Sequence, residues 1–296
     1  MELDCRGCAG CCLDWRPLAA DGDSPESVVA ERRGPYPPLS GAYNLVPLDR
    51  DEVRGFVEAG LADALTPRLW LADEDPSVEI DGHRLAAVGD RLAFFVGLRK
   101  PPKPVAPFDR ETANWLPTCV FLDPDTLQCR IYDDERYPSE CAEYPAHTIA
   151  LETETECERV EAAIGGERLL SREVDDEAGT TPLFGPQAIG GKLFCHPQPE
   201  TLRGTVERLA GGDATAADRA EFVAVAAASS PGTTAISEAH YEEGRDRALA
   251  ASSWAGEAIA DWKEMEAAGA EPRPTLAERV EEDRGAPATS GWDDRR

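Results

Sequence analysis

Lysine is scarce in this chain of 296 residues. Only four of its 30 basic residues are lysines, and its 57 acidic residues bring the formal net charge to −27 at pH 7. A protein with this charge is repelled by nucleic-acid phosphates and by anionic lipid headgroups. The charge balance therefore argues against non-specific binding to nucleic acid and against attachment to an anionic membrane.

The acidic excess has a simple explanation in terms of solvent. Abundant Asp and Glu with few lysines are typical of halophilic proteins. In such an acidic proteome, the surface carboxylates keep each protein hydrated in concentrated salt. At 1 M salt, charges are screened within about 3 Å. We therefore interpret most of the charge as a surface adaptation and not as a binding face.

Long apolar runs are also missing. The longest, Leu92–Leu98 and Phe222–Ala228, fall far short of the roughly 20 residues that a membrane-spanning helix needs. The acidic start Met-Glu-Leu-Asp-Cys differs from the basic and then apolar pattern of an export signal. We expect a cytoplasmic protein that does not bind membranes, in a compartment where disulfides rarely persist.

Hydrophobic periodicity and turn residues predict an α+β fold, in which a small irregular domain of β-hairpins and short helices, stapled by metal, precedes a helical C-terminal part. The expected domains are a metal-binding domain at 1–197 (motif core 1–15 and 115–150), a helical region at 198–269 and a disordered acidic tail at 270–296. The expected elements are a helix at 49–65, a hairpin turning at Asp81-Gly82, a strand at 92–98, a stiff linker at 101–107, a hairpin at 119–132, a helical turn at 138–144, a strand at 147–151, and helices at 202–209, 214–228 and 236–268.

Cysteine is the residue type that carries chemistry here. Seven of the nine cysteines form two groups, namely Cys5, Cys8, Cys11 and Cys12 in a C-x-x-C-x-x-C-C run and the more widely spaced Cys119, Cys129 and Cys141. C-x-x-C spacing lets two thiolates chelate one ion, and both zinc and iron favour thiolate. Gly7 and Gly10 permit the backbone turns of such a loop. We therefore predict metal binding by these seven residues.

The two groups are separated by 107 positions, from Cys12 to Cys119. Closing a loop of this length costs roughly 4 kcal/mol beyond a constant. A structural metal–thiolate site contributes about 10–16 kcal/mol. Metal binding outweighs the loop entropy, so we expect the two groups to converge on one composite site.

Seven thiolates exceed what one simple site needs. A zinc ion or a [4Fe–4S] cluster takes four, so a polynuclear site, or one cluster with spare thiols, fits the count better. Arg6, Arg130 and Arg136 lie in or beside the motifs and can offset negative charge. Cys157 and Cys195 stand alone in the sequence, and we interpret both as small buried apolar residues.

Taken together, the two motifs resemble those of the YkgJ-like cysteine-cluster proteins, which are described as zinc- or iron-chelating and often as containing an iron–sulfur cluster. The resemblance covers residues 1–150 and rests on Cys5, Cys8, Cys11, Cys12, Cys119, Cys129, Ile131, Tyr132, Arg136, Pro138, Cys141, Tyr144 and Pro145. The chain departs from the family pattern where Tyr137 separates Arg136 from Pro138, and where Ala142 replaces the usual arginine.

These observations lead to three functional hypotheses. The first is a metal-cluster protein that holds an iron–sulfur cluster, or failing that Zn²⁺, with Arg130, Tyr132 and Arg136 beside the ligands and an unknown protein or redox partner. The second is a zinc-stapled interaction module. The third is a modifying enzyme, because one branch of the resembled family is similar to flagellin lysine methylases. A dithiol role for the pair in the 119–132 hairpin ranks below metal binding.

Other candidate sites are weaker. His147 lies two residues after Pro145 and could support the ligands, whereas His196, beside Cys195, fits a turn before Pro197 better than a ligand. Gly190-Gly191-Lys192 lacks the rest of a phosphate-binding loop. No catalytic triad or acid–base pair is recognisable. The sequence therefore indicates metal binding more strongly than any particular reaction.

Overall fold

The computed structural model describes Cys5 and residues 7–19, 37–41, 43–132, 134–171 and 188–289. Over these residues the chain is a mixed α+β protein that divides into two compact units. Unit 1 is assembled from Met1–Pro25, Arg99–Thr181 and Trp254–Arg296, and unit 2 from Glu26–Leu98 and Pro182–Ser253. The boundary expected near residue 198 falls inside unit 2, because the strand just before it and the helices after it pack on the same sheet.

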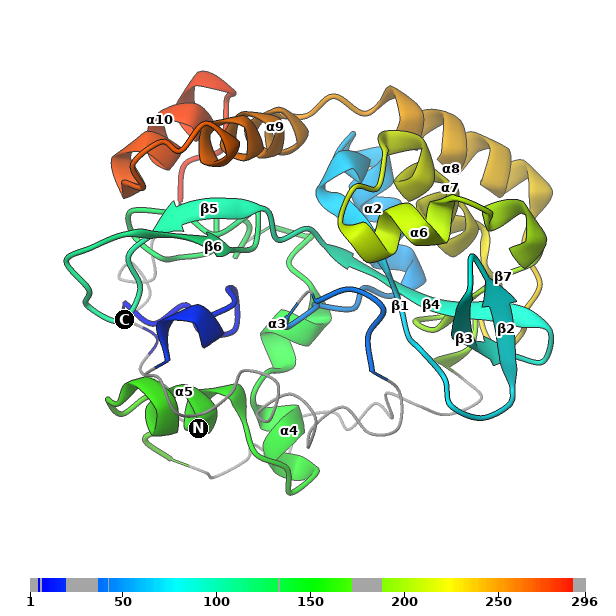
Figure 1. The fold of residues 1–296 in the computed structure, drawn as a ribbon, viewed down its shortest axis with the longest axis horizontal. Helices are drawn as coiled ribbons and strands as arrows, with labels where there is room; N and C mark the ends of the chain where they lie inside the picture. Colours follow the sequence, from blue (N-terminus) through cyan, green and yellow to red (C-terminus); the bar gives the residue numbers. More distant parts are fainter. Residues whose placement is uncertain are drawn as a thin grey trace. The chain divides into compact units, whose positions relative to one another are not determined.

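Unit 2 is built on an antiparallel sheet (Figure 1). Its strands, in spatial order, are β1 (Leu65–Leu69), β4 (Arg91–Leu98), β3 (His83–Val88) and β2 (Ser77–Ile80), and β7 (Phe194–His196) also pairs with β4. Asp81 and Gly82 join β2 to β3 with φ values of 53° and 79°. Positive φ at both positions is what a type I′ turn requires, so the predicted hairpin is confirmed.

One helix of unit 2, α7 (Ala216–Ala228), packs on this sheet, and α2 (Arg50–Glu58) and α8 (Glu238–Ala250) pack against α7. The unit also holds α6 (Thr205–Gly211) and the short 3₁₀ turns η2 (Ala62–Ala64) and η4 (Pro199–Leu202). Asp49 and Glu52 form a capping box that starts α2, and the helix predicted at 49–65 ends early, at Glu58. The ring of Phe222 in α7 lies 4.9 Å from that of Phe94 in β4. This aromatic contact places the buried face of α7 against the sheet.

Unit 1 holds a two-stranded ribbon and several short helices. Its elements are η1 (Arg16–Leu18), β5 (Pro102–Val105), β6 (Asn114–Pro117), α3 (Ser139–Glu143), α4 (Ala146–Ala150), α5 (Glu156–Ile164), α9 (Trp254–Ala267) and α10 (Pro274–Asp283). Helices α9 and α10 lie beside β5, in orange and red in Figure 1. The ribbon therefore carries the C-terminal helices on one side and leads into the cysteine-bearing segments.

Two local predictions in unit 1 are wrong. The proline-rich segment predicted as a stiff linker at 101–107 contains strand β5, whose Pro102 and Pro104 stand opposite Pro117 and Trp115 of β6. Proline tolerates an edge strand, and extended polyproline geometry lies close to strand geometry. The strand predicted at 147–151 is instead helix α4, a single turn that follows Pro145.

The predicted disordered tail is also wrong over part of its length. Helix α10 begins at Pro274 and buries Ala277, Val280 and Glu281. Arg284, just after it, pairs with Asp261 of α9 at 2.8 Å. Burial of a glutamate is rare without partners, so the local residue pattern did not indicate that this face is part of the core. Residues 290–296 of the predicted tail lie outside the described residues.

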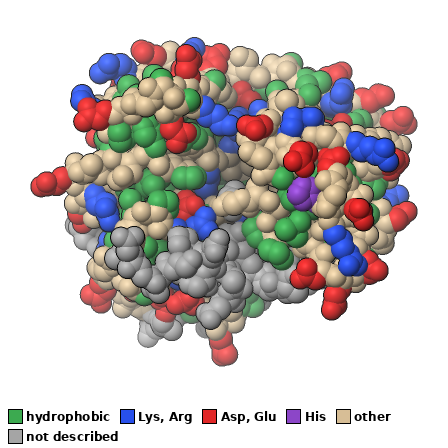
Figure 2. Space-filling model, viewed as in Figure 1, with side chains coloured by type: hydrophobic (Ala, Val, Ile, Leu, Met, Phe, Trp, Pro, Cys, Tyr) green, Lys and Arg blue, Asp and Glu red, His purple; other side chains and the backbone are tan. Residues whose placement is uncertain are grey.

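No helix among the described residues is long and apolar enough to cross a bilayer. Figure 2 shows Asp and Glu side chains scattered over the visible face, with Lys and Arg side chains among them. On this face the acidic residues are spread and do not gather into one patch.

Candidate functional site

The predicted cysteine groups converge within unit 1. Eight of the nine cysteines belong to it, and only Cys195, in β7, belongs to unit 2. The Cys119 amide donates to the carbonyl oxygen of Cys12 at 2.7 Å, and the Asp14 amide donates to Pro117 at 2.8 Å. Leu13 and Thr118 form an antiparallel bridge between these two bonds. The first motif therefore runs alongside the end of β6, where the second motif begins.

Four thiols from three separate segments interact electrostatically here, namely Cys12, Cys119, Cys129 and Cys141. Burial raises the pKa of all four. Mutual repulsion between thiolates adds to the effect, and the pKa of Cys129 rises to about 12 through burial and then Cys119. Cys5 interacts with Cys12 in the same way. We call Cys12, Cys119, Cys129 and Cys141 the thiol cluster.

Backbone amides lie near three sulfurs of unit 1. The Gly10 amide donates to the Cys8 sulfur at 3.5 Å. The amides of Phe121 and Leu122 oppose the rise in the pKa of Cys119, and the Ile131 amide opposes the rise in the pKa of Cys129. In each case the amide two residues after the cysteine favours the thiolate, as outer donors do at metal–thiolate centres.

Two of the four lysines lie next to the thiol cluster. Lys100 donates to the carbonyl oxygen of Cys11 at 3.2 Å. Its charge opposes the rise in the pKa of Cys12, Cys119 and Cys141. Lys103 is fully buried and acts in the same direction on Cys119 and Cys129. These cations partly offset the negative charge that ionised thiols would carry.

Cys8 and Cys11 face a different partner. The Cys11 thiol interacts with that of Cys157, in the first turn of α5, and this interaction is the main cause of a raised pKa at Cys11 and a lowered one at Cys157. Cys8 also interacts with Cys157. Sequence reasoning missed Cys157, because it stands alone in the sequence and no ligand spacing marks it.

The three residues expected beside the ligands have other partners in the structure. The Arg130 guanidinium donates to Glu281 at 2.6 Å and lies 3.0 Å from an Asp123 oxygen. Arg136 pairs with Asp134. The Tyr132 ring meets that of Tyr137 edge-on, with centroids 5.1 Å apart.

The two histidines weighed in the sequence lie apart from each other. His147 is buried in α4, within unit 1. His196 is buried in β7 of unit 2, where its Nε2 lies 3.1 Å from Glu221.

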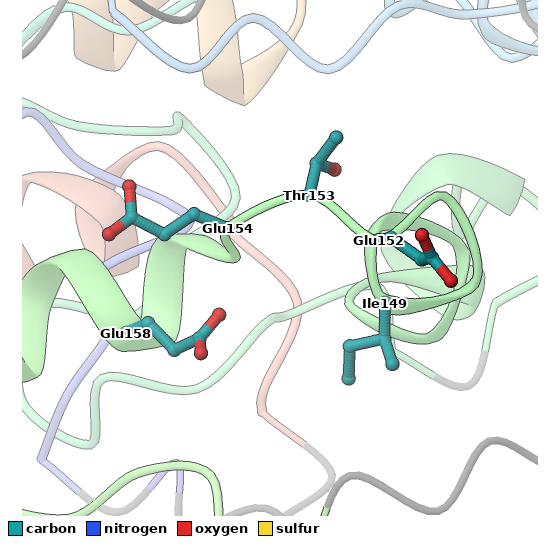
Figure 3. Close-up of a pocket in the computed structure, with 5 residues that line it drawn as sticks. All are labelled: Ile149, Glu152, Thr153, Glu154 and Glu158. Carbon is teal, nitrogen blue, oxygen red and sulfur yellow. The ribbon is translucent and has the colours of Figure 1, made fainter.

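Despite this crowding, no three His, Cys, Asp or Glu side chains of the described residues are placed to hold a single metal ion. The thiols are near enough to interact but are not gathered round one point. A surface pocket of about 460 Å³ lies where α4 leads into α5. It is lined by Ile149, Glu152, Thr153, Glu154 and Glu158 (Figure 3). Its carboxylates serve local structure: Glu154 pairs with Arg159 at 2.9 Å, and Glu158 caps α5.

A sequence model of DUF7531, a family of unknown function, matches residues 1–293. The chain belongs to this family. The match spans the segments of both units and not the cysteine motifs alone. No curated protein and no solved structure matches the chain.

The resemblance to YkgJ-like proteins is therefore wrong, because the family that matches is DUF7531 and no YkgJ-like family does. Closely spaced cysteines are dictated by the geometry of thiolate chelation, so unrelated chains can share them. The shifted Arg136 and the Ala142 in place of arginine were the departures that pointed away from the family.

Proposed function

We propose that unit 1 binds an iron–sulfur cluster through the thiolates of Cys12, Cys119, Cys129 and Cys141. The observation that carries this proposal is the convergence of these four thiols from three segments of the chain, with Cys119 buried and the other three half-buried. Thiols in such surroundings that repel one another when ionised are unfavourable neighbours. A cation among them removes that cost, because metal binding replaces the protons and binds the thiolates together.

The surroundings of the sulfurs support a metal–thiolate centre. Amide donors at Cys119 and Cys129 stabilise thiolate without adding a competing ligand. Four thiolates around a dication leave an excess of negative charge, and Lys100 and Lys103 lie where they reduce it. A chain with so few lysines places half of them within four residues, beside these thiols.

The spacing of the thiols favours a cluster over a single ion. A tetrahedral zinc site with Zn–S bonds of about 2.3 Å requires all four sulfurs to surround one point. The described side chains are not placed in that way. An iron–sulfur cluster holds its four thiolates farther apart, around several iron atoms. When bound, such a cluster supplies one-electron transfer, and the chain's own groups, the amides and lysines, would set its potential.

The alternative is a zinc ion that staples the same segments together, with unit 1 serving as a protein-interaction module. It uses the same ligands and requires the sulfurs to move closer. The Cys12–Cys119 backbone contact favours a structural role of this kind as much as electron transfer, because it already joins the two motifs. Metal identity therefore decides between the two functions.

The test is to purify the full chain anaerobically in concentrated salt and to measure iron, zinc and acid-labile sulfide per chain with the visible spectrum. We expect several irons, matching sulfide and a brown protein. The Cys129→Ser variant should lose both iron and sulfide. Cys195→Ser is the matched control, since Cys195 is also buried but belongs to unit 2.

Each other outcome has a definite meaning. Colourless protein with one zinc per chain would contradict the cluster and establish the staple. Full iron in the Cys129→Ser variant would remove that residue from the ligand set. Protein without any metal, prepared in the presence of iron, sulfide and zinc, would overturn metal binding altogether.

A further inference from the structure

The segment that follows α10 returns to the cysteine hairpin, residues 119–132. Helix α10 ends in a Schellman motif, in which the amides of Gly285 and Ala286 donate to carbonyl oxygens of the last helical turn at 3.0 and 2.8 Å. Gly285 has a φ of 80°, a conformation that residues with a side chain rarely adopt. The chain therefore leaves α10 in a fixed direction, which brings residues 287–289 onto the hairpin.

Arg130 is the residue of the hairpin that receives this segment. Its Nη1 donates to the carbonyl oxygen of Pro287 at 2.8 Å and to the Thr289 hydroxyl at 3.3 Å. Its Nε and Nη2 donate to Glu281 of α10 at 2.9 and 2.6 Å. All three nitrogens of the guanidinium thus hold the C-terminal segment, and Arg130 directly follows Cys129 in the chain.

Asp123 couples the segment to the turn of the hairpin. One carboxylate oxygen accepts from the amides of Asp125 and Thr126, both at 3.0 Å, and so shapes the turn. The other oxygen accepts from the Thr289 hydroxyl and lies 3.0 Å from Arg130. Because one side chain makes both sets of contacts, release of Thr289 loosens the turn as well.

The contacts of the C-terminal segment form an inner and an outer set. In the inner set, Glu281 is fully buried and also accepts from Lys103. In the outer set, Pro287 and Ala288 are exposed, Thr289 is half-buried, and the three residues belong to no helix or strand. Segments with exposed hydrogen bonds and little buried apolar surface open locally while the rest of the protein stays folded. The outer set therefore opens more easily than the inner one.

We propose that residues 287–289 form a releasable latch, which holds the cysteine hairpin closed and opens to admit and release metal. This inference rests on the proposed function, in which Cys119 and Cys129 of the hairpin are metal ligands. Metal that lies among packed segments enters only when one of them moves. The latch provides this movement at the hairpin, while buried Glu281 keeps α10 in place.

The test measures how fast iodoacetamide alkylates individual thiols of the full-length, metal-free chain, with mass spectrometry reporting each cysteine separately. The Gly285→Ala variant redirects the latch through its backbone, because a Cβ there is strained by φ but meets nothing within 4 Å. We expect Cys129 to react roughly three- to tenfold faster than in the wild type, which corresponds to the loss of one hydrogen bond. The rate at Cys157, a buried thiol of α5 in the same unit, should stay unchanged.

Gly269→Ala is the matched control. Gly269 follows α9 with a φ of 71°, and a Cβ there also meets nothing within 4 Å. The next residue, Ala270, accepts from the Trp115 indole at 2.9 Å, so this turn leads to β6 and not to the cysteine hairpin. Gly269→Ala should lower the stability about as much as Gly285→Ala and leave the rate at Cys129 as in the wild type.

Thr289→Val tests the latch without altering the backbone. It removes the hydroxyl that bonds to Asp123 and Arg130, and the exposed Thr275→Val, in α10, is its control. Thr289→Val should raise the rate at Cys129 selectively, and Thr275→Val should not.

Two outcomes of the alkylation would overturn the latch. One is an unchanged rate at Cys129 in both Gly285→Ala and Thr289→Val. The other is an equal increase at Cys129 and Cys157, which would mean that unit 1 unfolds as a whole. Alkylation of the metal-free chain needs no metal, so its result is independent of the metal proposal.

The role of the latch in metal exchange has its own measurement. In the metal-loaded chain, the two latch variants should lose metal to a chelator faster than their two controls. Equal rates of loss would overturn this role, whereas a chain that binds no metal would overturn the proposed function and leave the alkylation result standing.

Discussion

The amide of Cys119 donates a hydrogen bond to the carbonyl oxygen of Cys12 at 2.7 Å. This bond joins two cysteine motifs that lie 107 positions apart. It places Cys12 beside the turn that holds Cys119, whose thiol shares its electrostatic surroundings with that of Cys12. The contact means that the thiol cluster is assembled by backbone pairing and that its chemistry depends on a small set of nearby residues.

Lys100 is expected to strengthen metal binding through its charge. Its ammonium group opposes the raised pKa of Cys12, Cys119 and Cys141. Lys100→Gln should weaken metal affinity roughly tenfold, the equivalent of about one unit of pKa. Competition with a chelator measures the affinity, and Lys263→Gln, an exposed lysine on α9, is the control. Equal affinity in the two variants would show that Lys100 acts only through its bond to Cys11.

Gly10 allows the first cysteine motif to rest on α5. A Cβ at this position would meet Val160 Cγ2 at 2.7 Å, so Gly10→Ala should lower the free energy of unfolding by about 1–3 kcal/mol. Gly55→Ala is the control: a Cβ there meets nothing within 4 Å, and it should raise stability by roughly 0.5–1 kcal/mol. Urea unfolding measures both. Val160→Ala in the Gly10→Ala background should recover part of the loss, and no recovery would place the strain elsewhere.

Glu281 is the shared partner of two buried cations. Its carboxylate accepts from Lys103 at 2.6 Å and from Arg130 at 2.6 Å, and its side chain is fully buried. Glu281→Gln keeps the shape but leaves buried Lys103 without its counter-charge and Arg130 with Asp123 alone, so we expect a loss of about 3–5 kcal/mol in the free energy of unfolding. The neighbouring exposed Glu282→Gln should change it by less than about 0.5 kcal/mol. Similar unfolding curves for the two variants would disprove the buried network.

Asp218 should make unit 2 sensitive to acid. Hydrogen bonds from Arg208, and then from Thr215 and Thr205, hold the pKa of Asp218 well below its usual value. The stability from this group is therefore complete above the unfolded pKa of about 4 and is lost as the pH falls toward the folded value. Melting temperatures of the wild type and Asp218→Asn should differ at pH 7 and converge on acidification. The exposed Asp213→Asn should follow the wild type at every pH, and a gap that stays constant for Asp218→Asn would exclude the ionisation as its cause.

Local structure followed closely from local sequence where turn and capping residues were explicit. The Asp81-Gly82 turn appears as predicted, and a helix begins at Arg50, next to the predicted start at residue 49. The errors arose where tertiary partners overrode local preference. Strand β5 forms because β6 pairs with it, and α10 forms its buried face because Lys103 and Arg130 reach Glu281.

The candidate site shows the same division. Spacing alone singled out the seven cysteines of the two motifs, and the structure joins the two segments through the Cys12–Cys119 hydrogen bond, whereas metal binding by these residues stays a prediction. Spacing was silent about Cys157, which comes near the first motif because α5 packs against Gly10. The sequence placed Arg130 beside the ligands, whereas in the structure its guanidinium pairs with Asp123 and Glu281.

The sequence by itself determined that this protein is acidic, has an α+β composition and carries two groups of closely spaced thiols, because charge, periodicity and spacing are local properties that need no partner. Only the tertiary structure decided which thiols meet. Cys12, Cys119, Cys129 and Cys141 interact with one another, and Cys11 interacts with Cys157. Such contacts depend on which distant backbone segments pair with each other. The local spacing of residues along the chain does not reveal this pairing.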